Sequence, residues 1–590
     1  MRKRIRLGEL LLEQKLITPE QLQTALARQK QTGGMLGHLL IELGLIQEEQ
    51  ILKVLSEQLL LPVIDLRQYL FAPEVVRLLP EGHARRYRAI VLRSDEDGLV
   101  VGMVDPTDII AYDNLARLLK RPIKQALVRE AELMQAVDTV YRRTEEIVTL
   151  AEELGEEMAE GQFDVANLAT EGQSAADDAP VVRLLQSMFE DAVQVHASDI
   201  HIEPEEHLLR VRQRIDGFLH EQIIEETRIA SALVTRLKLM SGLDISEKRL
   251  PQDGRFHIKV KDVRIDIRLS TMPVQHGESI VMRLLDQSAN LLSFDQLGIP
   301  AGPRARLEQL IQRPNGMLLV TGPTGSGKTT TLYAALNAIN LPEHKIITVE
   351  DPVEYRLPRI NQVQVNARIE LTFGRVLRSA LRQDPDVIMV GEMRDPETAE
   401  IGVRAAMTGH LVLSTLHTND SISTVNRLVD MGVPGYMVAT ALNAVIAQRL
   451  VRRVCENCAQ PSEPTAGEHA WIKAMGGATG IKSGKLRAGT GCQYCNNTGY
   501  RGRVGLYELL ELDAALAEHL RQGDYQSFER TASRQASFRP LAASGLDYVL
   551  EGVTTVSEVI RVTGGIEDLP SYVLASTAQA AERPALSAAS

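Results

Sequence analysis

Cysteine and aromatic residues are scarce in this chain. Four cysteines and one tryptophan occur among 590 residues, and aromatic residues make up 4% of the total. A dense framework of disulfides is therefore excluded, and we expect a reducing compartment. Basic residues are in deficit as well, because 65 Lys and Arg against 77 Asp and Glu give a net charge of −12. This deficit argues against a nucleic-acid surface of the usual basic kind.

Long apolar runs are also missing from the sequence. No stretch approaches the roughly 18 apolar residues of a membrane span, and the basic start MRKRIR leads into a segment that carries Glu9 and Glu13. These acids interrupt what would be the core of a signal peptide, so we expect a cytoplasmic protein. Hydrophobic residues still make up 44% of the chain. At about 150 residues per domain, the length predicts several globular domains.

The first sixty residues contain an internal repeat with an offset of 29 residues. Eleven residues recur identically at this offset, beginning with Leu7 and Leu36. In the first copy Thr18 stands at a helix N-cap position and Pro19 at the first helical position, and apolar residues follow at helical spacing. We therefore expect residues 1–60 to form two copies of one helical hairpin.

The middle of the chain alternates strand-like and helix-like segments. Short apolar runs at 87–92 and 99–104, together with helical segments near 108–120 and 130–142, predict a small α/β part over residues 61–143. Residues 144–180 contain eleven acidic residues and no Lys or Arg, which is typical of an acidic linker. A second α/β domain is expected over residues 181–287.

The largest domain is expected over residues 288–565. Its runs MLLV, IITVE, DVIMV and LVLST are short and continuously apolar, as in parallel strands that helices cover on both faces. The tail over residues 566–590 is rich in Ala and Ser and is expected to be disordered.

A complete GxxxxGK[ST] pattern lies between a strand-like and a helix-like segment of this domain. It comprises Gly322, Pro323, Thr324, Gly325, Ser326, Gly327, Lys328 and Thr329, and Thr330 follows. The glycines let backbone N–H groups turn toward phosphates, Lys328 supplies a positive charge, and Thr329 binds Mg²⁺. The pattern predicts an ATP site, and the alternative of an incidental Gly-rich turn is disfavoured because both flanking segments agree with the motif.

Acidic residues and histidines end several predicted strands nearby. Glu392 is our first choice for polarising the attacking water, and Glu350 is the second, with a positioning or metal-water role. The alternative for either acid is an ordinary surface loop. His410 and His417 flank the LVLST strand and are candidates for sensing the γ-phosphate, although a single histidine is more often structural.

All four cysteines fall into two CxxC pairs. The pairs are separated by 33 residues and comprise Cys455, Cys458, Cys492 and Cys495. Four thiolates in this arrangement complete a tetrahedral structural Zn²⁺ site, with no position open to a substrate. A redox switch is the alternative, but two pairs that use every cysteine fit a metal better.

Four segments together resemble a known family. GPTGSGKTT, VEDPVEY, RQDPDVIMVGEMRD and TGHLVLSTLHTN look like the Walker A, Asp box, Walker B and His box of the secretion and type IV pilus assembly ATPases. The resemblance covers about residues 62–565. It implies a RecA-like motor that forms a homo-hexamer, docks peripherally at the bacterial inner membrane, and uses ATP to move pilin subunits through a platform protein with other pilus assembly membrane proteins.

The resemblance also implies further site residues. Arginines of the domain before the motor and of the motor itself would contact nucleotide, and by motif these are Arg268, Arg283, Arg378 and Arg382. A planar, permanently charged guanidinium suits this role, and the alternative for each is a structural ion pair. Assembly and secretion members carry the zinc-binding subdomain, here about residues 452–500, which favours extension or secretion over retraction.

The repeat resembles the cyclic di-GMP-binding module of pilus extension ATPases and of some secretion ATPases. The ligand contacts that it implies are Arg6, Leu7, Gly8, Gln29, Leu36, Gly37, Gln58, Arg85 or Arg86, and Asp105. Lys15 replaces the glycine that ends the first short helix, where a left-handed cap would be mildly strained, and Met35 replaces an arginine. The alternative for Asp105 is a plain turn former. The alternative for the repeat is a pair of helical hairpins that only docks a partner.

The expected fold class is a multidomain α/β protein. It combines a RecA-like P-loop motor, a preceding small α/β domain, an N-terminal helical-hairpin repeat with its own α/β subdomain, and a four-cysteine zinc insert. The expected function is an ATP-hydrolysing motor for pilus extension, regulated by cyclic di-GMP, with a type II secretion ATPase as the alternative. A scaffold without turnover and a nucleic-acid translocase are less favoured; the cyclic dinucleotide is the only nucleic-acid-like partner expected.

Overall fold

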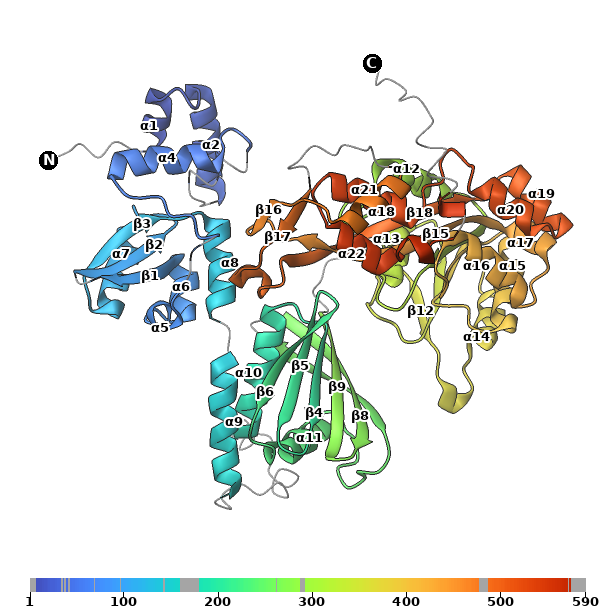
Figure 1. Cartoon of the computed structure of the whole chain (residues 1–590), viewed down its shortest axis with the longest axis horizontal. Coiled ribbons are helices and arrows are strands. Elements are labelled where there is room, and N and C mark those ends of the chain that lie inside the picture. The colour runs from blue at the N-terminus through green and yellow to red at the C-terminus, as the bar shows by residue number, and fades with distance from the viewer. Residues whose placement is uncertain are drawn as a thin grey trace. The chain divides into compact units, whose positions relative to one another are not determined.

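Two compact units make up the computed structural model of the chain (Figure 1). One comprises Met1–Thr149 with Gly491–Asn497, and the other comprises Leu150–Thr490 with Thr498–Ser590. The structure describes residues 7–32, 36, 39–40, 43–67, 69, 71–95, 97–141, 144–159, 180–260, 263–286, 292–476, 486–570 and 572–574. Across these ranges, no helix combines the length and the apolar character needed to cross a bilayer.

The repeated segment opens the first unit with helices α1 (Leu7–Glu13), α2 (Pro19–Thr32) and α4 (Glu48–Leu59). Leu11 and its repeat equivalent Leu40 are both fully buried in one apolar core. Lys15 has a φ of 56° and its equivalent Gly44 a φ of 66°. The left-handed cap expected at Lys15 is therefore confirmed, at a position where glycine is the more favourable residue.

A three-stranded sheet follows in the first unit. Its strands β1 (Ala89–Asp95), β2 (Gly98–Met103) and β3 (Ile123–Leu127) lie in the order β1-β2-β3, with β1 antiparallel and β3 parallel to β2. The accompanying helices are α5 (Pro73–Val76), α6 (Glu81–Tyr87), α7 (Ile109–Leu119) and α8 (Glu130–Val140). The strands expected near 87–92 and 99–104 are confirmed.

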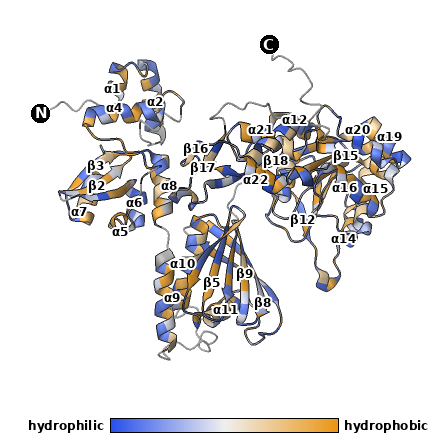
Figure 2. Cartoon of the chain, viewed as in Figure 1, coloured by the Kyte–Doolittle hydropathy of each residue, from blue (hydrophilic) through white to orange (hydrophobic). Residues whose placement is uncertain are grey.

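Two long helices and a six-stranded antiparallel sheet form the next part of the chain. The helices are α9 (Thr144–Ala159) and α10 (Pro180–Gln194), and residues 160–179 of the expected acidic linker lie outside the described residues. The sheet has the order β6-β5-β4-β9-β8-β7, and its elements are β4 (Asp199–Pro204), β5 (Leu209–Ile215), β6 (Phe218–Ile224), α11 (Ile229–Met240), β7 (Gln252–Val260), β8 (Val263–Val274) and β9 (Gly277–Asp286). Buried and partly buried residues alternate along β5, as expected when a helix covers one face, and the strands of this sheet carry both hydrophobic and hydrophilic residues (Figure 2).

The largest sheet has seven strands in the order β12-β11-β13-β14-β10-β15-β18. They are β10 (Gly316–Thr321), β11 (Ile346–Glu350), β12 (Asn361–Gln364), β13 (Val387–Val390), β14 (Leu411–Leu416), β15 (Leu442–Val454) and β18 (Tyr500–Glu511). The neighbours pair in parallel except at the edge, where β18 runs antiparallel to β15. The four strand-like runs of the sequence are confirmed as β10, β11, β13 and β14.

Helices cover both faces of this sheet. Met317 and Leu319 of β10 join one apolar core, whereas the alternate residues Leu318 and Val320 join another. The helices are α12 (Ala301–Leu310), α13 (Lys328–Ile339), α14 (Phe373–Ala380), α15 (Pro396–Met407), α16 (Ser421–Asp430), α17 (Gly435–Ala441), α18 (Ala466–Ala474), α19 (Ala514–Gln522), α20 (Tyr525–Ala532), α21 (Leu541–Leu550) and α22 (Val556–Thr563). Short elements complete the chain: η2 (Ala367–Ile369), β16 (Ala459–Pro461), β17 (Arg487–Gly489), η3 (Gln493–Cys495) and η4 (Ile566–Asp568). Residues 575–590 of the expected tail lie outside the described residues.

Candidate active site

The phosphate loop joins strand β10 to helix α13, which begins at Lys328. Gly322, Gly325 and Gly327 have φ values of 150°, 80° and 87°, in the region where side chains are strained. A Cβ on Gly322 would lie only 2.4 Å from the carbonyl oxygen of Gln448. Glycine is therefore required at Gly322 by space as well as by backbone conformation. The loop ends at the amino terminus of α13, where unpaired N–H groups favour an anion.

Lys328 is buried within the loop that it serves. Its Nζ donates hydrogen bonds to the carbonyl oxygens of Gly322 and Pro323, at 2.8 and 3.0 Å. Burial lowers the pKa of this amine to about 8, and the positive charge of Arg449 acts in the same direction, whereas the negative charge of Glu392 opposes it. Among the described residues its hydrogen-bond acceptors are these two carbonyl groups, which the charged amine can exchange for phosphate oxygens.

Other loop residues also fit a bound nucleotide. Ser326 Oγ is buried and finds no hydrogen-bond partner among the described residues. Thr329 and Thr330 are exposed beside Lys328. This set of backbone N–H groups, one amine and three hydroxyl groups fits the phosphates of ATP and an accompanying Mg²⁺.

Glu392 follows strand β13 and lies in a charged cluster. Its Oε2 is 3.2 Å from Nε2 of His417, and its other oxygen forms an ion pair with Arg394. The hydrogen bond to Glu392 raises the pKa of Arg394, whose guanidinium is also 3.8 Å from Asp351. The Glu392 side chain is 13% exposed, so the carboxylate is oriented by its neighbours yet accessible.

Glu350, at the end of β11, is in a different environment. It is 3% exposed and accepts hydrogen bonds from Tyr333 Oη at 2.5 Å and Thr348 Oγ1 at 2.5 Å. Gln362 Nε2 donates a third at 3.2 Å. Burial raises the pKa of Tyr333, so its phenol remains a donor. These contacts hold Glu350 rigidly and leave it less accessible than Glu392.

The two histidines lie at opposite ends of β14. His417 follows the strand and contacts Glu392, whereas His410 precedes it and lies 3.0 Å, through Nδ1, from the carbonyl oxygen of Ala405. A six-residue strand spans roughly 20 Å. The structure therefore brings His417, but not His410, to the acidic cluster within this chain.

Arg268 and Arg283 share a cavity of about 560 Å³. They lie opposite each other on β8 and β9. Arg268 pairs with Glu354 at 2.8 Å and donates to the carbonyl oxygen of Val353 at 3.2 Å. Arg283 Nε donates to Asp199 at 3.0 Å. The cavity is also lined by Pro352, so it adjoins the segment that follows Glu350.

Arg378 and Arg382 belong to a separate cationic surface at the end of α14. Arg378 forms an ion pair with Glu397, and both side chains are more than half exposed. Arg382 donates from Nη1 to the carbonyl oxygen of Arg378 at 2.7 Å. These two arginines therefore face outward from the chain that carries them.

The four cysteine sulfur atoms come together. All four Sγ atoms lie within 4.8 Å of one another, and those of Cys492 and Cys495 are 3.7 Å apart. Zinc–sulfur bonds of about 2.3 Å in a tetrahedron place sulfur atoms about 3.8 Å apart. The cluster is compatible with a structural Zn²⁺ ion held by thiolates alone.

The residues expected to contact the cyclic dinucleotide are partly described. Leu7, Gly8, Gln29, Leu36, Gln58, Arg85 and Asp105 are described, whereas Arg6, Met35 and Gly37 lie outside the described residues. A Cβ on Gly8 would lie 2.8 Å from Leu22, so the helix approaches its neighbour closely there.

Two charged candidates of the first unit already have partners. Asp105 accepts hydrogen bonds from the backbone N–H and the Oγ1 of Thr107, at 2.8 and 2.5 Å, and so also acts as the turn former named as the alternative. Arg85 pairs with Glu81 at 2.9 Å.

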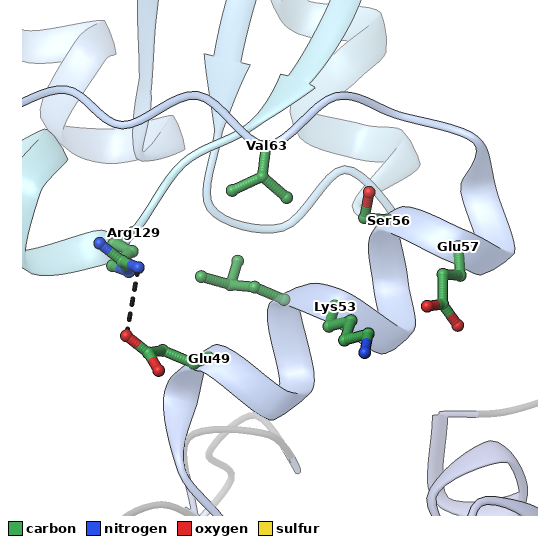
Figure 3. Close-up of a pocket in the computed structure, with 7 residues that line it drawn as sticks. Glu49, Lys53, Ser56, Glu57, Val63 and Arg129 are labelled. Atoms are coloured by element: carbon green, nitrogen blue, oxygen red, sulfur yellow. Dashed lines mark hydrogen bonds and ion pairs between the residues drawn. The ribbon is translucent and has the colours of Figure 1, made fainter.

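A pocket of about 310 Å³ lies beside helix α4 in the first unit (Figure 3). It is lined by Glu49, Leu52, Lys53, Ser56, Glu57, Val63 and Arg129. Arg129 pairs with Glu49 across it at 3.4 Å. None of the residues expected to contact the dinucleotide lines this pocket. The pocket is therefore not the expected dinucleotide site.

Comparison with known proteins decides the family. The model of the type II/IV secretion system protein family matches residues 174–561. The chain belongs to this family. The model of the MshEN domain matches residues 59–147. The expected family membership is confirmed.

Relatives match nearly the whole of their own length. The type IV pilus assembly ATPase PilB of Myxococcus xanthus is 42% identical over 560 residues, which cover 95% of this chain and 99% of the relative. The type II secretion system ATPase E of Vibrio cholerae is 42% identical over 496 residues, 83% and 97% of the two chains. A crystal structure of the pilus retraction motor PilT with ADP is 28% identical, covers 65% of this chain and 98% of that one, and has a TM-score of 0.45. The pilus assembly and secretion relatives are both ATPases, which confirms the expected ATP hydrolase activity of this secretion-family ATPase. Its seven-stranded sheet with the phosphate loop after β10 agrees with the expected RecA-like motor.

Three residues of this secretion-family ATPase were missed by the motif analysis. Arg394 stands inside the GEMRD segment, so the motif held the signal, but only the structure shows that it pairs with Glu392. Tyr333 lies within α13, five residues after Lys328, where the pattern assigns no role. Arg449 lies on β15, outside every motif considered.

Proposed function

We propose that this ATPase is a homo-hexameric motor that drives extension of a type IV pilus of the MSHA type, docked at the inner membrane on a platform protein, under the control of cyclic di-GMP. The arrangement of Lys328, Glu392 and His417 around the phosphate loop carries the proposal, because it supports turnover and not only binding. The chain is 42% identical to a pilus assembly ATPase, over 99% of the length of that relative, and this similarity supports the pilus role.

The site supports a division of roles in hydrolysis. Lys328 turns from its two carbonyl acceptors to the phosphates, and the loop N–H groups hold them in place. Thr329 would hold Mg²⁺, which neutralises phosphate charge when bound. Glu392 accepts the proton of the attacking water, and His417 orients its carboxylate.

Glu350 and the arginines complete this proposed division. Glu350, which is held by hydrogen bonds from three donors, has the positioning or metal-water role expected for it. Arg268 and Arg283 supply positive charge from the preceding domain, and Arg378 and Arg382 supply it from an outward surface, which suits contact with a neighbouring subunit. His410 has a structural role at the far end of β14.

Regulation by cyclic di-GMP is supported by the first unit. The repeat pattern, the close approach at Gly8 and the adjoining MshEN match at residues 59–147 agree with a dinucleotide-binding module. A messenger that binds the active arrangement more tightly than the idle one must shift the population toward activity.

Type II secretion is the second candidate function. The secretion ATPase of Vibrio cholerae is also 42% identical, so identity does not separate the two machines. Complementation of a strain that lacks the native copy separates them, with Lys328→Ala as the inactive control. The proposal predicts restored surface pili with unchanged protein secretion. Restored secretion without pili would favour the alternative, and restoration by Lys328→Ala would overturn the motor itself.

A further inference from the structure

A buried arginine lies behind the phosphate loop and has no role in the motifs. Arg449 is 8% exposed on strand β15, which pairs in parallel with β10 directly before the loop. A Cβ on Gly322 would be 3.2 Å from Nη1 of Arg449. The guanidinium therefore packs against the first residue of the loop, on the side that strand β15 occupies.

The guanidinium, packed against Gly322 of the phosphate loop, donates hydrogen bonds to the segment that follows β14. Arg449 Nη2 donates to the carbonyl oxygen of Asn419 at 3.0 Å and to its Oδ1 at 3.1 Å. Nη1 donates to the carbonyl oxygen of Gln448 at 3.4 Å, and the Gln448 side chain accepts from Thr331 of α13 at 2.7 Å. Asn419 stands two residues after His417, the partner of Glu392. One side chain thus connects the loop that holds phosphates to the segment that orients the acid.

The charge of Arg449 is not compensated by a direct partner. Each of its hydrogen bonds in the described part of the chain goes to a neutral acceptor, and no ion pair within 4.0 Å joins it to an acid there. Burial of a cation without an ion-pair partner is costly. Burial lowers the pKa of Arg449 and outweighs the negative charges of Glu508 and Asp420, which raise it without direct contact. Phosphates bound in the adjoining loop would add negative charge to this attraction.

We propose that Arg449 is a positioning residue for ATP hydrolysis, which fixes the phosphate loop to the His417 segment and complements the charge of bound phosphates from behind. The inference depends on ATP hydrolysis alone, and not on the pilus, the platform protein or the messenger. Failure of those proposals would leave it unchanged. It names a role outside the Walker motifs and outside the arginines of the preceding domain.

The test compares steady-state kcat and KM for ATP in the full chain. Arg449→Lys keeps the charge but loses the two-pronged contact with Asn419, so kcat should fall by roughly 10- to 100-fold while KM changes by less than about threefold. Arg449→Gln also removes the charge, so KM should rise by about tenfold or more as well. Arg453→Gln, an exposed arginine on the same strand, is the matched control and should leave both constants unchanged.

Asn419→Ala tests the connection from its other end. If Arg449 and Asn419 act as one link, the double variant Arg449→Lys/Asn419→Ala should be no slower than Arg449→Lys alone, whereas independent effects would multiply. Thermal unfolding is followed for every variant. If the Arg449 variants fail to fold, the kcat of Asn419→Ala tests the proposal. This variant keeps the charge of Arg449 and the backbone carbonyl of residue 419 that accepts from it, and loses only the side-chain acceptor. Unchanged kcat in Asn419→Ala, multiplying effects in the double variant, or unchanged KM in Arg449→Gln would each overturn the proposal.

Discussion

Replacing Glu392 with glutamine separates the role of this acid from that of Glu350. The ion pair of Glu392 with Arg394 involves a guanidinium that is 62% exposed, and pairs of this kind contribute at most about 1 kcal/mol. In a domain of this size that corresponds to a shift in Tm of about 2–4 °C. Loss of a general base, by contrast, reduces kcat by roughly 10²- to 10⁴-fold, which is about 3–5 kcal/mol of activation free energy.

Glu350→Gln should behave differently. Glu350 is 3% exposed and accepts three hydrogen bonds. The substitution replaces one carboxylate oxygen by an N–H₂ group, which is a donor. The donor that bonded this oxygen would then be left without an acceptor. Such a mismatch in a buried site costs about 1–3 kcal/mol. We therefore expect a lower Tm together with a lower kcat.

Phosphate release and thermal unfolding, measured on the same samples, check both variants. Glu400→Gln is the matched control, because Glu400 belongs to an exposed ion pair with Arg404 on α15. Binding of a non-hydrolysable ATP analogue should persist in Glu392→Gln. A kcat within threefold of the unmodified chain in Glu392→Gln would refute the assignment of this carboxylate as the base.

Three further outcomes are expected. Burial lowers the pKa of Lys328 to about 8, so its amine is charged below that pH and neutral above it. We therefore expect kcat/KM to fall about tenfold per pH unit above pH 8. A flat profile to about pH 10 would contradict this role of Lys328. Metal analysis of purified protein should find about one zinc ion per chain, reduced in Cys455→Ser, and a folded, metal-free sample would rule the site out. Lys15→Gly should stabilise the first unit by about 1 kcal/mol, seen as a higher melting temperature, and Gly44→Ala at the equivalent position should act in the opposite direction; no difference between the two would contradict the strain argument.

The motor sheet was predictable because its signal is local. Short, continuously apolar runs that end in Gly or Glu mark strands β10, β11 and β13 directly, and the phosphate loop follows a fixed pattern. Lys15 was predictable for the same reason, since the repeat aligns it with a glycine. Each of these inferences uses only neighbouring residues or an exact internal comparison.

Contacts between distant segments could not be predicted in this way. His410 and His417 look equivalent in the sequence, but a strand separates them by its full length, and only one end of that strand meets Glu392. The environment of Glu350 depends on Tyr333 and Gln362, which come from a helix and from an edge strand. Arg449 becomes noticeable only when β15 is placed beside β10.

The most direct test of the account is a calorimetric titration of cyclic di-GMP into the full chain, with and without a non-hydrolysable ATP analogue. We expect saturable binding that Gln58→Ala weakens by about tenfold or more. The ATP analogue should change the affinity, since coupling between two sites is reciprocal. Glu74→Ala, at an exposed position on α5 in the same unit, is the control and should bind normally. No binding at about 1 mM messenger, in protein that still hydrolyses ATP, would contradict a messenger-gated motor and leave an ATPase whose hairpins dock a partner.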